Sequence, residues 1–316
     1  MADAVLSTSS RPATQIQSPP KKRKGPRDGA GMLFVLPGVL GLLLFSAGPL
    51  AAAFYLSFTS YDILNAPQWI GFDNYTRAFT SDDQFWPSIR RTFLYVLMEV
   101  PIGIVLSLLL AVLLNQNLKG TRLFRTLFFL PSITPAVAAI FFWIWMFNPY
   151  FGPINYGLGE IGIWGPDWLQ STDWALPSLA IIGVWASAGG TRMVIFLAGL
   201  QGIPQDLYDA ASIDGAGPWQ RFINITVPLL SPTIFFVTVL SIINALKVFT
   251  AVYIGTDGGP AYATWVFGFH LFKQAFQFFQ MGYASALGWI FFVVILAFTL
   301  IQFRLQSKWV HYEGAD

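Results

Sequence analysis

The chain has 316 residues, of which 55% are hydrophobic and only 11% are charged. An ordinary soluble domain carries about 25% charged residues, so this composition excludes a solvated globular enzyme. The mean hydropathy of +0.57 and the long apolar blocks indicate an all-α integral membrane protein. The absence of cysteine excludes disulfides and thiolate metal sites, and the two histidines, His270 and His311, are too distant in sequence to favour a metal site.

Residues 1–30 are rich in Ser, Thr, Pro and Gln and cannot bury a core, so we expect a disordered tail. Its basic cluster, residues 21–27, resembles a nuclear-localisation patch in isolation. The cluster directly precedes a long apolar segment, however, where positive charge holds a helix flank in the cytoplasm. A cleaved signal peptide is less favoured, because the apolar stretch from Met32 to Phe58 far exceeds the ~7–15 residues that such peptides use. Residues 31–316 are expected to form the transmembrane domain.

Six segments have the ~20 apolar residues that a helix needs to cross the bilayer. They are residues 32–58, 92–114, 123–147, 176–200, 229–250 and 282–303. Six spans place both termini on one side of the membrane, and we expect that side to be the cytoplasm. This orientation satisfies the positive-inside rule. With the basic tail, the expected inner cations are Lys119, Arg122, Arg125, Arg221, Arg304 and Lys308; the expected outer cations are Arg77, Arg90, Arg91 and Lys273.

Several predicted spans contain proline, which removes a backbone donor and is expected to bend its helix. These prolines are Pro37, Pro49, Pro101, Pro131, Pro135, Pro177 and Pro232. Broken helices are typical of a bundle that lines a cavity, although proline is also generally more frequent in membrane helices than in soluble ones.

The segment from Trp265 to Phe279 has a different pattern, with polar residues on one helical face and aromatic residues on the other. His270, Lys273, Gln274 and Gln277 follow the spacing i, i+3, i+4, i+7. This pattern predicts an interfacial helix that lies flat at the outer surface.

Between the fourth and fifth spans, residues 201–232 predict two short helices that meet at a glycine turn. Pro204 favours the first turn of a helix, and Leu207, Ala210 and Ala211 form an apolar stripe. The Asp214-Gly215 pair predicts a sharp turn, and Pro218 opens a second helix. A small apolar face on such an elbow is suited to a groove on a cytoplasmic partner. An ordinary cytoplasmic loop with two helical turns is the structural alternative.

The stretches 208–216 and 222–232 resemble the EAA loop of permease subunits of bacterial ATP-binding-cassette importers. Asp209 stands where the family has glutamate, and Gly215 stands at the expected glycine. Segments 69–75, 125–131, 148–155 and 258–260 are similar to the carbohydrate-uptake branch, in particular its maltose-type first permease subunit. The resemblance implies that the ATPase subunits contact the elbow. The expected coupling residues are Leu207, Tyr208, Asp209, Ala210, Ala211, Asp214, Gly215 and Ala216.

The resemblance also implies a multi-pass protein of the bacterial cytoplasmic membrane that works in a heteromeric importer. Its expected partners are a second homologous permease, two ATPase subunits, an extracellular or periplasmic solute-binding protein and membrane lipid, with no nucleic acid. No Gly-x-x-x-x-Gly-Lys-Ser/Thr loop is present, so ATP and magnesium are expected in the partner subunits and no cofactor in this chain. The sequence also lacks a supported catalytic constellation, so we do not expect an enzyme.

Polar residues within membrane spans usually face a bundle interior or a water-filled cavity. Glu99 and Arg192 are the charged ones, and direct contact between them is not expected, because Glu99 lies nearer the predicted outer face and Arg192 nearer the inner. Arg192 either meets an anionic solute group or, more simply, extends toward the cytoplasm. The family resemblance implies that the translocation site lies among the spans before and after the EAA loop, in segments 185–192 and 241–248. The residues there with suitable chemistry for carbohydrate are Trp185, Ser187, Thr191, Arg192, Ser241, Asn244 and Lys247.

Each of these side chains has a packing interpretation as well, because small residues permit close helix contact. The main hypothesis is a carbohydrate-importer permease that works by alternating access. The alternatives are an ion-coupled secondary transporter, which normally has midplane carboxylates and internal repeats, and a membrane scaffold or sensor that transports nothing. The transported solute is left open by the sequence.

Overall fold

The structure is a computed structural model that describes residues 28–116, 119–307 and 309–310. Most of the predicted basic tail, and Lys308, therefore lie outside the described residues. The chain divides into two compact units, residues 1–51 and residues 52–316. The first contains α1 (Asp28–Leu42), the π-helical turn η1 (Leu43–Ala47) and the start of α2 (Gly48–Leu56), which together form an apolar helix from Leu33 to Leu56.

Three further helices are long and apolar enough to cross a membrane. They are α4 (Phe85–Leu114), the helix Pro218–Leu246 and α15 (Met281–Gln306). The middle one consists of α11 (Pro218–Arg221), η2 (Phe222–Thr226) and α12 (Val227–Leu246). The described residues thus contain four such helices, and six spans if two bent helix pairs each count as one.

The first bent pair is α5 (Thr121–Ile133) with α6 (Ala136–Met146), which meet at 99°. Its break lies at Thr134-Pro135, where Thr134 is extended because a residue before proline avoids the helical conformation. The prediction that proline breaks a span is confirmed here. Pro101 and Pro232, by contrast, lie inside α4 and α12 without ending them.

The second bent pair is α8 (Ala175–Ala188) with α9 (Thr191–Gln201), which meet at 42° around Gly189-Gly190. A Cβ atom at Gly189 would lie 2.3 Å from the carbonyl oxygen of Phe128, so glycine permits the close approach of α5. We attributed bends to proline and missed this one, for which the Gly-Gly pair was the available signal.

Shorter elements connect the long helices. An antiparallel pair of two-residue strands, β1 (Thr59–Ser60) and β2 (Gln68–Trp69), qualifies the all-α prediction. The remaining elements are α3 (Asp73–Thr80), α7 (Pro153–Glu160), α10 (Gln205–Ile213), α13 (Thr250–Gly255), α14 (Phe267–Phe272) and η3 (Lys273–Gln277).

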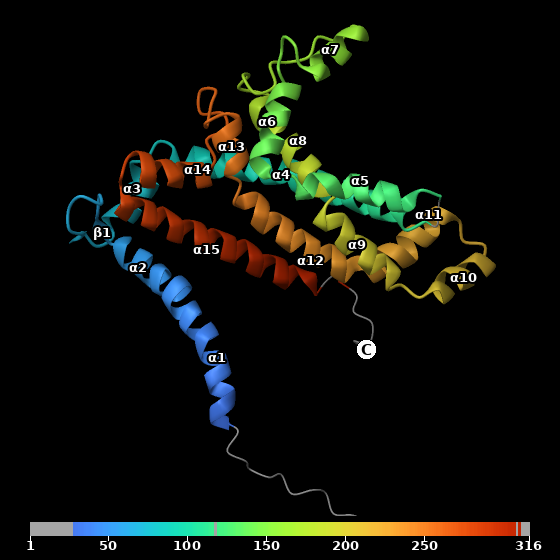
Figure 1. Cartoon of the computed structure of the whole chain (residues 1–316), viewed down its shortest axis with the longest axis horizontal. Coiled ribbons are helices and arrows are strands. Elements are labelled where there is room, and N and C mark those ends of the chain that lie inside the picture. Colours follow the sequence, from blue (N-terminus) through green and yellow to red (C-terminus); the bar gives the residue numbers. More distant parts are fainter. Residues whose placement is uncertain (1–27, 117–118, 308, 311–316) are drawn as a thin grey trace, which may run out of the picture. The chain divides into compact units, whose positions relative to one another are not determined.

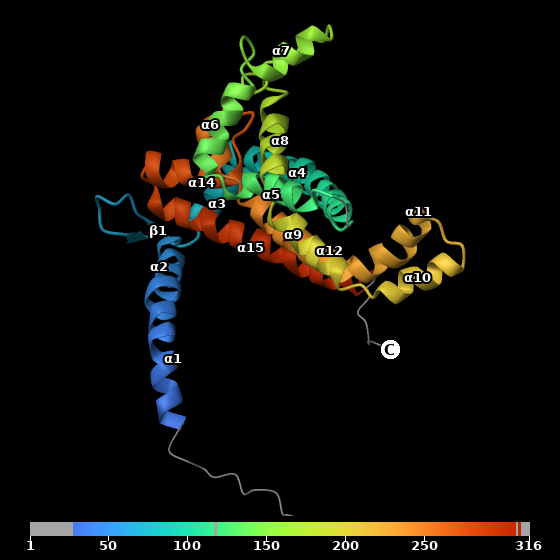
Figure 2. The ribbon, with the colours of Figure 1, turned by 45° about the vertical axis from the view of Figure 1, so that its right-hand side comes forward.

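Helix α4 is the central helix of the second unit, because it packs against α8, α9 and α12. One buried cluster surrounds Leu179 and Phe269, and a second surrounds Phe196 and Leu230 beside the later turns of α4. Both views place α10 and α11 at one end of the second unit and α3 and α14 at the other (Figures 1 and 2).

The prediction of an interfacial helix over 265–279 is wrong in the direction of its polar face. His270, Lys273 and Gln274 are buried and Phe276 and Phe279 are more than half exposed, while Gln277 is exposed and Phe269 is buried as expected. Partners from distant connections explain why His270 and Lys273 are buried. Lys273 Nζ lies 3.0 Å from Asp257 Oδ1, and His270 Nε2 lies 2.8 Å from Asp82 Oδ2.

Asp82 is the centre of a polar network that joins the start of α4 to α14 and α15. The Tyr283 hydroxyl donates to Asp82 Oδ2 at 2.5 Å, and the indole N–H of Trp265 donates to His270 Nδ1 at 3.0 Å. That second bond leaves the Nε2 proton of His270 for Asp82. Burial raises the pKa of Asp82, but the hydrogen bonds from His270 and Tyr283 outweigh it and lower the pKa to about 2.

We expect Asp82→Asn to reduce stability at neutral pH and to flatten its dependence on acid. The folded protein has the lower carboxyl pKa, so the stabilisation is complete above the unfolded value of about 4 and is lost as pH falls through about 2. Thermal unfolding of the purified chain from pH 7 to pH 2 measures both effects. Asp83→Asn, which changes the adjacent exposed carboxylate, is the matched control. Equal pH profiles for wild type and Asp82→Asn would contradict the network's role.

Candidate functional site

The loop between α9 and α12 contains the two short helices and the glycine turn expected there. Helix α10 follows Pro204, and Gly215 has a φ of +76°, a region that residues with a side chain rarely adopt. Gly217 and Pro218 then begin α11, where the Gln220 side chain accepts a hydrogen bond from the Gly217 N–H at 2.8 Å. We call residues 204–223 the coupling loop, after the role that the sequence resemblance led us to expect.

Side-chain hydrogen bonds hold the coupling loop in a bent form. The hydroxyl groups of Tyr208 and Thr226 lie 2.9 Å apart and join α10 to η2. Arg221 Nη1 donates to Ser212 Oγ at 2.8 Å across the same bend. Asp209 accepts a hydrogen bond from Gln205 within α10, so its shorter carboxylate has a local partner.

The outer surface of the coupling loop carries large apolar side chains. Ile213 is 87% exposed and Trp219 is 70% exposed, with Leu207 and Ile223 less so. Among the expected coupling residues, those that the structure leaves exposed are Leu207, Asp209, Ala210, Asp214 and Gly215, and those half-buried are Tyr208, Ala211 and Ala216. Ile213 was not among our expected coupling residues. Its signal was a large aliphatic side chain directly before the Asp-Gly turn.

The coupling loop lies across a cavity from the end of α4. This cavity, of about 450 Å³, is lined by Asn115 and Gln116 beyond α4, Leu200 on α9, and Tyr208 and Phe222 on the loop. Arg125 on α5 donates to the carbonyl of Leu114 at 2.7 Å and so satisfies one of the last carbonyls of α4. The loop is thus adjacent to a basic helix end.

Glu99 and Arg192 form a buried ion pair, which corrects the expectation that they do not meet. Arg192 Nη2 donates a hydrogen bond to Glu99 Oε2 at 3.1 Å, and Nη1 lies 2.9 Å from Oε1 as an ion-pair contact that is not a hydrogen bond. Ser187 Oγ also donates to Glu99 Oε1, at 2.9 Å. The bend between α8 and α9 brings Ser187 and Arg192 to the same carboxylate, which span positions alone did not reveal.

Two glycines make room for this pair. A Cβ atom at Gly103 would lie 2.3 Å from Arg192 Nη1, and one at Gly183 would lie 2.5 Å from the Tyr95 hydroxyl and 3.0 Å from Glu99 Cγ. We did not anticipate the role of these glycines, because each depends on a contact between α4 and the α8–α9 pair.

The other expected pathway residues do not join this cluster. Trp185 is half-buried and packs against the rings of Phe142 and Trp143, with centroids 6.3 and 5.6 Å away. On α12, Ser241 is buried and Asn244 is exposed; Lys247, directly after α12, and Thr191 on α9 are also exposed. Within the described ranges, no hydrogen bond links Ser241, Asn244 or Lys247 to the Glu99 cluster.

The described residues contain no group of three or more His, Asp or Glu side chains arranged to hold a metal ion. The main polar and exposed features described above are the coupling loop, at one end of the helix bundle, and the buried Glu99–Arg192 pair within the bundle.

Comparison with known proteins assigns the family. Residues 103–310 match the model of the binding-protein-dependent transport system inner membrane component. The chain is 45% identical to the probable ABC transporter permease protein YesP of Bacillus subtilis (strain 168), with 91% of this chain and 93% of YesP covered. It is 32% identical to the sn-glycerol-3-phosphate transport system permease protein UgpA of Yersinia pestis bv. Antiqua, with 89% and 95% covered.

A solved structure has the same fold. A chain of a bacterial ABC transporter involved in the import of the acidic polysaccharide alginate superposes with a TM-score of 0.80 at 25% identity, with 89% of this chain and 96% of that chain covered. The apolar helices, the family match over about two thirds of the sequence and the relatives matched over nearly their whole length agree. This chain belongs to the family of binding-protein-dependent transport system inner membrane components and is a multi-pass ABC transporter permease of the inner membrane.

Proposed function

We propose that this chain is a permease subunit of an ATP-driven importer that moves a carbohydrate, or a related polyol or glycerol phosphate, across the cytoplasmic membrane by alternating access. The family membership supports dependence on a solute-binding protein. The relatives named for sn-glycerol-3-phosphate and alginate transport support the carbohydrate class. The expected assembly adds a second permease and two ATPase subunits, which bind ATP and magnesium.

One observation carries the proposal: the coupling loop presents exposed apolar side chains at one end of the helix bundle. Isolated exposed apolar residues are ordinary, but Ile213 and Trp219 flank a turn held by hydrogen bonds and belong to the loop that resembles the EAA segment. Arg125 and Arg221 lie at the same end of the bundle. With Lys119 and Arg122 and the basic N-terminal cluster of the sequence, they support a cytoplasmic orientation for that end under the positive-inside rule, which is the side where the ATPase subunits are expected.

The ion pair weakens the case for an ion-coupled carrier. Such a transporter needs a membrane carboxylate that binds and releases its coupling ion. Glu99 is already neutralised by Arg192 and accepts a hydrogen bond from Ser187. A Glu99–Arg192 pair with a structural role is consistent with a permease whose transport is driven by ATP hydrolysis in partner subunits.

The coupling role predicts that Ile213→Asp with Trp219→Asp lowers ATP-dependent uptake at least tenfold. A charge in the centre of an apolar protein interface costs about 2 kcal/mol or more, which releases the ATPase subunits. The measurement is co-purification of the ATPase subunits and uptake into vesicles by the complete transporter. Leu64→Asp is the control, because Leu64 is 92% exposed and lies in the first connection, distant in sequence from the loop. Retained ATPase and full uptake in the double variant would refute this coupling surface.

A further inference from the structure

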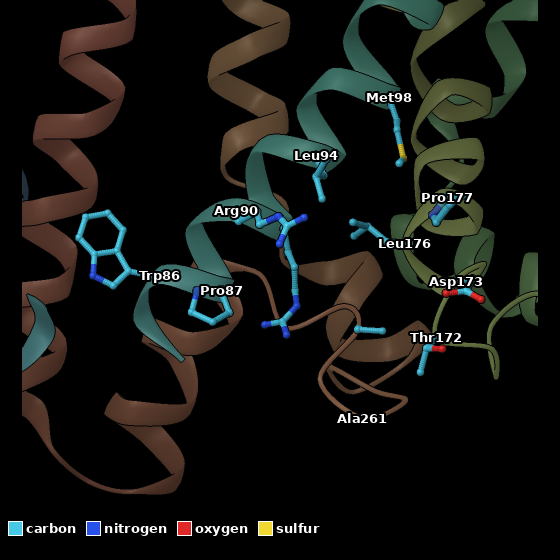
Figure 3. Close-up of a pocket in the computed structure, with 12 residues that line it drawn as sticks. Trp86, Pro87, Arg90, Leu94, Met98, Thr172, Asp173, Leu176, Pro177 and Ala261 are labelled. Atoms are coloured by element: carbon cyan, nitrogen blue, oxygen red, sulfur yellow. The ribbon is translucent and has the colours of Figure 1, made fainter. Parts of the chain in front are cut away.

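The largest cavity among those described for this chain lies at the other end of α4 from the coupling loop. Its volume is about 810 Å³. Figure 3 shows Arg90 and Leu94 on α4, with Leu176 and Pro177 at the start of α8 and Ala261 on the connection before α14. Arg91 also lines the cavity, and Asp173 contributes a carboxylate.

The two arginines outnumber the one carboxylate, Asp173, that lines the cavity, so the described lining carries a net positive charge. Arg91 Nη1 donates to the Gln84 amide oxygen at 3.3 Å. Across the described part of the chain, no Asp or Glu oxygen lies within 4.0 Å of either guanidinium, although Asp173 lines the same cavity. Adjacent like charges are held together here, and an anion between them would relieve their repulsion.

Apart from Thr172 and Asp173, the rest of the lining is apolar and comes from one side of α4 and from the segments that face it. Pro87, Arg90, Leu94 and Met98 recur at helical spacing, and Leu176 of α8 also lines the cavity. Apolar side chains cover the C–H surfaces of a sugar ring, while a guanidinium donates two parallel hydrogen bonds to a carboxylate. The volume falls within the ~300–1,000 Å³ typical of small-molecule sites.

The position of the cavity along α4 supports entry of the solute from outside the cell. Helix α4 rises about 1.5 Å per residue, so the 24 residues from Arg90 to Leu114 separate the cavity from the coupling loop by about 36 Å. If the coupling loop faces the cytoplasm, the cavity opens toward the side from which the solute arrives.

We propose that this cavity is an entry site for an acidic carbohydrate, in which Arg90 and Arg91 bind the sugar's anionic group and the apolar wall covers its ring. The inference rests on the proposed function and narrows its substrate class to sugars that carry a carboxylate or a comparable anion. The Asp173 carboxylate would repel the ligand's anionic group, so this group is expected to bind next to Arg90 and Arg91 and away from Asp173.

The test measures binding of a mannuronic acid trisaccharide and its fully methyl-esterified form to the purified full chain in phosphatidylcholine nanodiscs. The ester keeps the shape of the ligand and removes its charge. We expect the acid to bind at least tenfold more tightly than the ester. Arg90→Gln with Arg91→Gln should remove that preference, whereas Asp173→Asn should tighten binding of the acid a few-fold.

Two control variants separate the site from general charge and from folding. Lys119→Gln with Arg122→Gln removes two cations beyond the other end of α4 and should leave the preference unchanged. Arg90→Lys with Arg91→Lys retains both positive charges and should retain most of the preference for the acid over the ester. That result would show that the glutamine variant loses the preference because it loses charge.

Equal binding of acid and ester, or a preference that persists in the glutamine variant, would overturn the proposal. Arginine-dependent retention of phosphatidylglycerol that blocks the acid would overturn it too, since the arginines would then hold lipid phosphate. These results are independent of the coupling-loop experiment. A chain that still requires Ile213 and Trp219 for uptake but shows no acid preference keeps the proposed function and loses only this site.

Discussion

Glu99→Ala is expected to lower the free energy of unfolding by about 3–5 kcal/mol, because it leaves the Arg192 charge buried without a partner. The side chain of Glu99 is only 4% exposed and that of Arg192 is 12% exposed, so solvent screens the pair weakly. Ser187 would lose its acceptor as well. Thermal and denaturant unfolding of the purified chain in nanodiscs measures the loss.

The matched control replaces both partners, as in Glu99→Met with Arg192→Met. A buried ion pair exchanged for apolar residues of similar volume is often close to neutral in stability, so the double variant should recover most of the loss. A single variant within about 1 kcal/mol of wild type would mean that water reaches Arg192 and that the pair is not a buried structural contact. If the double variant is stable but transports poorly, the pair positions α8 and α9 against α4 during transport.

Gly215→Pro is expected to abolish ATP-dependent uptake while leaving membrane insertion intact. Proline requires a φ near −65°, whereas Gly215 has a φ of +76°, and its N–H donates to the Ser212 carbonyl at 3.2 Å. The substitution therefore breaks the turn between α10 and α11. The loop is exposed at the end of the bundle, so the spans themselves should fold. Uptake by the complete transporter and the amount of chain in the membrane are the two measurements.

Gly215→Asn is the control for this position. Asparagine adopts the left-handed conformation at modest cost, and no atom lies within 4 Å of a Cβ built at Gly215. We expect this variant to retain most of its uptake. Undiminished uptake in Gly215→Pro, with the ATPase subunits still attached, would show that the turn is not needed for coupling.

Several features of this protein followed from local sequence. Apolar length predicted where the long helices lie, because a membrane span depends on its own ~20 residues. Pro204, Gly215 and Pro218 predicted the two helices and the turn of the coupling loop, because proline and glycine restrict or free the backbone at their own positions.

Contacts between distant segments required the tertiary structure. Glu99 and Arg192 are 93 residues apart, and their pairing depends on a bend at Gly189-Gly190 that has no proline signal. Helical periodicity identified the polar face that includes His270 and Lys273 but assigned it to solvent.

The sequence alone therefore determined which segments are apolar helices and where the backbone turns, because propensity and hydropathy act over a few neighbouring residues. The tertiary structure decided which charges are neutralised and which faces are buried. A buried polar side chain generally has a partner that satisfies it, and Asp82 and Asp257, from other segments, are those partners for His270 and Lys273.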